Sequence, residues 1–232
     1  MMGRTHALSG LVLGAAAGQF VWHSAPGYLA VAAAVTAGAA VLPDLDHPDA
    51  SIARSFGFVT EAFAWVVEHL CGGHRHGTHS LVGAAVFTGG AYAADHYRQS
   101  PAGKAGLALL LVLVLAAGLR ALKIGGHFGD LIAIGGAAAM VGTGFGLAGV
   151  PWAIAVGTVT HLLGDMLTDE GIPVAWPVSR RRVRLLPEPF AFTTGTRPER
   201  WFVAPMLLAA LAWLAWLVTN SAALVPGGRI TR

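Results

Sequence analysis

Long apolar segments alternate with short polar loops along most of the chain, and this pattern predicts membrane-spanning helices. We expect one membrane-embedded domain over residues 1–232, an all-α polytopic helical bundle with about seven spans. The predicted spans are residues 3–20, 29–42, 80–94, 105–119, 131–148, 152–167 and 201–224.

Residues 51–71 differ from the spans because apolar and polar positions alternate there at helical spacing. Glu61 and Glu68 oppose a crossing, so we expect an amphipathic helix on the membrane surface. The predicted span 29–42 is shorter than the usual crossing of about 20 residues. We therefore expect the loop that follows it to lie slightly inside the apolar layer, surrounded by protein or water.

Composition supports the membrane assignment and excludes several other classes. Hydrophobic residues make up 55% of the chain and charged residues 12%, whereas soluble domains carry about 25% charged residues. The mean hydropathy is +0.62. No block of charge indicates nucleic-acid binding. A single cysteine, Cys71, excludes an internal disulfide and a cysteine-rich zinc site.

The basic residues predict an orientation. With seven spans, one face holds eleven of the 15 lysine and arginine residues. Because basic loops remain in the cytoplasm, we expect the N-terminus on the cytoplasmic side of the membrane and the C-terminus on the opposite side. The same face receives every candidate metal ligand, although the charge count did not require this.

The segment Leu42–Pro48 carries the densest group of candidate ligands. It places Asp44, Asp46 and His47 within four residues, and a proline near each end restricts the loop. Carboxylates and imidazoles are ligands for hard and borderline metals. The segment therefore predicts one wall of a metal site.

His161 and Asp165 supply a second wall. They are four residues apart in an apolar segment, so a helix places both on one face. Ionisable residues within a span are costly and are functional candidates. The alternative is a structural hydrogen bond between the two side chains. His6, at the start of the first span, is an interfacial residue by itself and a ligand if it joins this group.

The polar segment 74–80 contains His79 as the favoured ligand and Arg75 as a candidate clamp for an anionic substrate oxygen. Thr78 and Ser80 could orient the ligands. The alternative is an ordinary polar loop that begins a helix at Thr78 or Ser80.

The predicted site therefore has three groups of residues. The metal ligands are His6, Asp44, Asp46, His47, His79, His161 and Asp165. The catalytic residues are Asp46 and Arg75. Further candidates for supporting roles are His74, His76, Thr78, Ser80, His127 and Asp130. Seven ligands exceed the needs of one catalytic zinc, so one or two divalent ions could bind, with zinc or manganese favoured and iron also suited to these ligands.

Several short motifs, in this order, resemble the YdjM-like family of inner-membrane proteins. They are Thr5-His6 with Gly10, Leu42 to His47, His74-Arg75 with Thr78 to Ser80, His161 to Asp165 with Leu167-Thr168 and Gly171, and Trp176-Pro177. The resemblance implies a membrane-bound metal-dependent hydrolase. The chain departs from the family pattern at His76, where glycine is common, and at Asp169, where proline is frequent.

We expect hydrolysis of an ester or phosphoester by metal-activated water. A lipid or lipid-linked phosphate is the expected substrate, because the site lies at headgroup depth beside arginines. The alternatives are a metal transporter or sensor, and a protein whose metal only holds helices together. The predicted spans 80–94, 105–119 and 201–224 contain almost no polar groups, which disfavours a path for ions.

Overall fold

The computed structural model describes residues 1–21, 25–188 and 190–221, and its regular secondary structure is helical. Within these ranges no strand occurs, and β-pairing is limited to two isolated bridges. The α-helices are α1 (Gly3–Phe20), α2 (Pro26–Ala39), α3 (Phe58–Cys71), α4 (Leu81–His96), α5 (Pro101–Leu122), α6 (Gly129–Thr143), α7 (Val150–Met166) and α8 (Ala204–Ser221). The short helices are η1 (Leu42–Asp46), η2 (Gly126–Phe128), η3 (Leu147–Gly149) and η4 (Glu199–Val203). The all-α prediction is confirmed.

Among the described residues, four helical stretches are long and apolar enough to cross a membrane: Pro26–Asp46, Pro101–Leu122, Leu147–Met166 and Glu199–Asn220. The chain is therefore a multi-pass membrane protein. Helices also form at the other three predicted spans, as α1, α4 and α6, with 18, 16 and 15 residues. Because these three are shorter or more polar, the count of seven spans stays a prediction. The predicted end of the last span at residue 224 lies outside the described residues.

The second span differs from its predicted form. α2 begins at Pro26, where a proline in the first turn loses no helical hydrogen bond. After Ala39 the chain continues through η1, so the apolar stretch extends to Asp46 and has 21 residues. Pro43 is accommodated at the start of η1 for the same reason. The apolar helical stretch is therefore longer than the predicted span 29–42, and Asp44 and Asp46 lie in its last turn.

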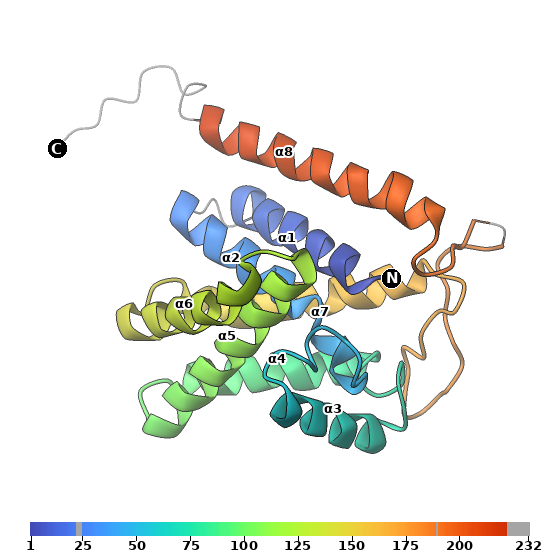
Figure 1. The fold of residues 1–232 in the computed structure, drawn as a ribbon, viewed down its shortest axis with the longest axis horizontal. Helices are drawn as coiled ribbons and strands as arrows, with labels where there is room; N and C mark the ends of the chain where they lie inside the picture. Colours follow the sequence, from blue (N-terminus) through green and yellow to red (C-terminus); the bar gives the residue numbers. More distant parts are fainter. Residues whose placement is uncertain (22–24, 189, 222–232) are drawn as a thin grey trace.

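α7 lies in the middle of the bundle, where α1, α2 and α4 pack against it (Figure 1). Small residues allow the helices to approach closely. A Cβ atom on Gly157 of α7 would lie 2.4 Å from the Cβ of Ala39 in α2. Ile154, one turn before Gly157, is fully buried in the apolar core. α8 runs along the outside of α1 and leaves most of its apolar surface exposed (Figure 1).

α3 matches the predicted amphipathic segment, with its first residue at Phe58 rather than at residue 51. It packs on η1 and buries Thr60 and Ala64. Phe58 and Leu70 are 82% and 77% exposed, so large apolar side chains point away from the protein. Such a face fits a helix that lies against lipid, as predicted.

Candidate metal centre

Four segments that are far apart in the sequence meet at the C-terminal end of α7. α7 contributes His161 and Asp165, α1 contributes His6, and η1 contributes Asp44. His79 comes from the loop directly before α4. The four residues other than Asp44 are at most 1% exposed, and the Asp44 side chain is 18% exposed. Asp44 is thus the member of this set that is accessible to solvent.

Hydrogen bonds fix the orientation of the two central imidazoles. Nδ1–H of His161 donates to the backbone carbonyl of Ala40 at 2.8 Å. Nδ1 of His79 lies 3.0 Å from Oγ1 of Thr78 and 3.3 Å from Oδ2 of Asp46. A carbonyl or carboxylate oxygen can only accept, so the proton on each ring is assigned to Nδ1. Each Nε2 is then the atom that faces the centre, as in histidines that bind metal.

The atoms around the centre have the spacing of a tetrahedral metal site. The two Nε2 atoms are 3.1 Å apart. Each lies 3.5 Å from Oδ2 of Asp165 and 3.6 Å from Oδ1 of Asp44. Ligand atoms about 2.0–2.2 Å from a tetrahedral zinc are themselves about 3.3–3.6 Å apart. Four of these five distances fall in or at the edge of this range, and the distance between the two Nε2 atoms is slightly shorter, so the residues fit a zinc-sized ion.

Two further observations support a cation at this position. Oδ2 of Asp165 is buried and has no hydrogen-bond partner among the described residues. In addition, burial lowers the pKa of His79, but hydrogen bonds to Asp44 and Asp46 outweigh it and raise this pKa to about 9. This shift favours a second proton on the His79 ring, beside the two carboxylates, when no metal is bound. A metal would have to replace this proton.

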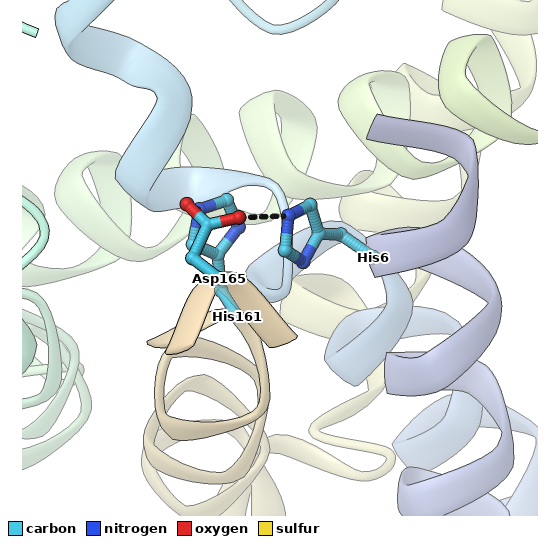
Figure 2. Close-up of side chains that lie close together, drawn as sticks. All are labelled: His6, His161 and Asp165. Atoms are coloured by element: carbon cyan, nitrogen blue, oxygen red, sulfur yellow. Dashed lines mark hydrogen bonds and ion pairs between the residues drawn. The ribbon is translucent and has the colours of Figure 1, made fainter. Parts of the chain in front are cut away.

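His6 lies on the far side of Asp165. Its Nε2 is 3.1 Å from Oδ1 of Asp165, and its ring stacks on His161 with a centroid distance of 3.7 Å (Figure 2). The amino group of Met1 also donates to this Oδ1. His6, His161 and Asp165 form one group close enough to hold a metal, and Asp44, His74 and His79 form another. The two groups adjoin at the His79–His161 contact.

Asp46 was predicted as both a ligand and a catalytic residue. It lies at the Nδ1 side of His79, away from the Nε2 atom that faces the centre. Its Oδ1 accepts a hydrogen bond from Nδ1 of His74 at 2.8 Å. Its Oδ2 accepts from the backbone N–H of Arg75 at 3.0 Å and from Oγ1 of Thr78. The side chain is fully buried. Its contacts therefore position the loop that carries His79, which is a supporting function for a ligand.

Arg75 connects the centre with the protein surface. The residue is 7% exposed, and its Nε lies 3.6 Å from Oδ2 of Asp165. Its Nη1 donates to Oε2 of Glu170 at 2.8 Å. Its backbone has φ 59°, a left-handed conformation that non-glycine residues rarely adopt. The loop thus directs a buried positive charge toward the candidate ligands.

The remaining predicted residues near the loop have local partners. Ser80 is the N-cap of α4, and its Oγ accepts from the N–H of Gly83 at 3.1 Å. Ser80 therefore begins α4, whereas Thr78 contacts Asp46 and His79. Nδ1 of His76 donates to the carbonyl of His74 at 3.0 Å. The His47 ring packs on the edge of the His74 ring, with a centroid distance of 4.6 Å.

His127 and Asp130 do not join the centre. Asp130 forms an ion pair with Arg120, and His127 is exposed in η2. Among the described residues, neither belongs to a group that could hold a metal. His23 lies outside the described residues.

Sequence reasoning missed two acidic residues. Glu170 contacts Arg75 and is 54% exposed at its side chain. Glu199 is fully buried and accepts hydrogen bonds from the N–H groups of Met2 and Gly195, both at 2.7 Å. No spacing or motif marks either residue, because both act through contacts between distant segments. Glu199 joins the start of α8 to the start of α1.

The comparisons with known proteins identify the family. The sequence model of the YdjM inner membrane protein family matches residues 1–224. The chain belongs to this family. Searches of curated proteins and of solved structures found no match. The resemblance inferred from the short motifs is therefore confirmed, together with a location in a lipid bilayer.

Proposed function

We propose that this member of the YdjM family is a metal-dependent hydrolase of esters or phosphoesters. One divalent ion, with zinc favoured by the ligand spacing, is held by Asp44, His79, His161 and Asp165. The observation that carries the proposal is the pair of facing Nε2 atoms, 3.1 Å apart and each within 3.6 Å of two carboxylates. This arrangement brings two imidazole nitrogens and two carboxylates to one point, and a cation at that point stabilises it.

The surrounding residues provide the other requirements of hydrolysis. A metal bound here supplies Lewis-acid activation of water and of the substrate oxygen. His74 is a suitable proton acceptor, because its Nδ1–H donates to Asp46 and its other ring nitrogen is left to take up a proton. The His74 side chain is 34% exposed, so it can exchange protons with solvent. Arg75 is placed to bind a negative oxygen of the substrate.

The substrate and the orientation follow from the position of the centre. The ligands lie at the ends of α2 and α7, where apolar stretches finish and arginines begin. This position favours a lipid or lipid-linked phosphate as substrate. The excess of basic residues on the same face favours a cytoplasmic site, with the N-terminus in the cytoplasm and the C-terminus on the other side.

A metal-binding protein without catalytic activity is the second candidate. It is favoured by the presence of four protein ligands, since structural zinc sites are closed by four ligands whereas catalytic sites keep a position for water. Ions could then stabilise the helices or be sensed or transported. The partial exposure of Asp44 favours the catalytic alternative, because a carboxylate at the surface can give way to substrate or water.

The test combines metal analysis with an activity screen on detergent-purified protein. Wild type and His161→Ala are compared for metal content by mass spectrometry, and both are offered phosphomonoesters, phosphodiesters and a lipid panel. One equivalent of metal in wild type, none in the variant, and metal-dependent hydrolysis only in wild type would support the proposal. Bound metal without any hydrolysis would favour the structural or transport alternative.

The metal stoichiometry also distinguishes one ion from two. With one ion, His74 remains a proton acceptor and His6 supports Asp165. Two equivalents would place one ion in each of the two groups, so that His6 and His74 become ligands. No metal after loading with zinc or manganese would contradict both arrangements.

A further inference from the structure

The surface side of Arg75 holds a second arginine and one carboxylate. Oε2 of Glu170 accepts a hydrogen bond from Nη1 of Arg75 at 2.8 Å, and Nη1 of Arg182 lies 3.8 Å from the same oxygen. The three side chains run from buried to exposed. Arg75 is 9% exposed at its side chain, whereas Arg182 and Glu170 are 43% and 54% exposed. One carboxylate oxygen thus occupies the space between two guanidinium groups.

The backbone holds this arrangement in place. Ile172 and Val183 form an isolated antiparallel bridge, which holds the segment that follows Glu170 beside the segment that carries Arg182. Gly171 has φ +60°, and a Cβ atom there would lie 2.6 Å from the carbonyl oxygen of Val183. A side chain at residue 171 would separate the two segments. The approach of Arg182 to Glu170 is therefore built into the fold.

The position of Glu170 between two guanidinium groups is suited to a larger anion. Two guanidinium groups around one oxygen are a common arrangement for binding phosphate. Ion pairs between exposed side chains are weak, so an anion with more oxygen atoms can replace the Glu170 carboxylate.

We propose that Arg75 and Arg182 bind the phosphate group of the substrate and that Glu170 competes for this position when no substrate is bound. The inference rests on the proposed function for its substrate class, since Arg75 lies beside Asp165, a proposed metal ligand. Glu170 is then a specificity-determining residue. A weakly charged anion does not displace its carboxylate from the two arginines, whereas phosphate does. Arg182, which the sequence marks only as part of a basic run, becomes a substrate-binding residue.

The experiment titrates the full-length, zinc-loaded protein in detergent with inorganic phosphate by calorimetry. Glu170→Gln should bind phosphate about two- to fivefold more tightly, and Arg182→Gln should bind about two- to fivefold more weakly, as expected for partly exposed charges. Glu188→Gln and Arg184→Gln are matched controls, because these two residues pair with each other and not with Glu170 or Arg182. The controls should keep the wild-type affinity.

The proposal is overturned if Glu170→Gln binds phosphate no more tightly than Glu188→Gln, or if Arg182→Gln binds no more weakly than Arg184→Gln. A second titration uses short-chain phosphatidic acid. Tighter binding than that of inorganic phosphate would assign the site to a lipid headgroup, and equal binding would assign it to free phosphate. Both results are consistent with phosphate binding by Arg75 and Arg182.

A third titration after treatment with a chelator separates this inference from the hydrolase proposal. The two arginines and Glu170 are side chains of the protein and do not depend on the metal. Without metal, phosphate should therefore still bind most tightly to Glu170→Gln, less tightly to wild type and most weakly to Arg182→Gln. Absence of hydrolysis with this order intact would reject the hydrolase alone. Loss of the order in a protein that still hydrolyses esters would reject the arginine pair alone.

Discussion

The fold uses the His/Asp pair His161/Asp165 differently from the pair His127/Asp130, although both pairs lie at helical spacing. His161 and Asp165 are four residues apart in α7, and both are buried against residues from three other segments. His127 in η2 and Asp130 at the start of α6 are three residues apart; His127 is exposed, and Asp130 pairs with Arg120. The difference shows that spacing brings two groups together, whereas a metal site also needs partners from distant segments.

The largest expected effect on metal binding comes from substituting a proposed ligand of the first pair. His161→Ala should weaken metal binding by more than about 100-fold, because it removes one of four ligands from a buried site. His127→Ala should keep the wild-type metal content. Mass spectrometry of the purified proteins measures both. An unchanged metal content in His161→Ala, with normal elution and helicity, would contradict the assigned ligand set.

A smaller effect on metal affinity is expected for Asp46, which contacts a proposed ligand. Asp46→Asn should lower metal affinity by about 10- to 100-fold, since Asp46 orients His79 through Nδ1 and holds its loop. Competition with a chromophoric chelator gives the affinity. Asp49→Asn is the control, because Asp49 pairs with Arg54 at the surface. If Asp46→Asn instead lost all metal, as His161→Ala does, Asp46 would be a ligand as the sequence predicted.

Metal affinity should also depend on pH. The pKa of His79 is raised to about 9, so this residue carries an extra proton at pH 7 that the metal must displace. Affinity should therefore rise about tenfold per pH unit between pH 7 and 9 and level off above pH 9. Chelator competition across this range, in metal-free buffers, measures the slope. A flat profile would show that His79 is not a ligand.

The smallest effect is expected at the second pair. Asp130→Asn breaks a partly exposed ion pair with Arg120, so the free energy of unfolding should fall by no more than about 1 kcal/mol. Thermal unfolding followed by tryptophan fluorescence detects the change, with metal content as a second readout. A loss of metal in this variant would mean that the α5–α6 connection supports the centre.

Hydrophobic patterning predicted the positions of the helices well, because apolar segments in a membrane must satisfy their backbone hydrogen bonds as helices. Its errors lie at the helix ends. α5 extends from Pro101 to Leu122 instead of 105–119, since Ser100 caps it and Pro101 begins it. The second span continues into η1, which moved Asp44 and Asp46 from a loop into a helical turn.

The sequence by itself determined the membrane class, the family and the residue types at the centre, because composition, motif order and apolar length are local properties. Tertiary structure decided which residues face one another. It placed Asp46 behind His79, joined Glu170 to Arg75 and left His127 at the surface. The positions of these side chains depend on how each helix is rotated and on which distant segments touch. The spacing of residues along the chain specifies neither the rotation nor the contacts.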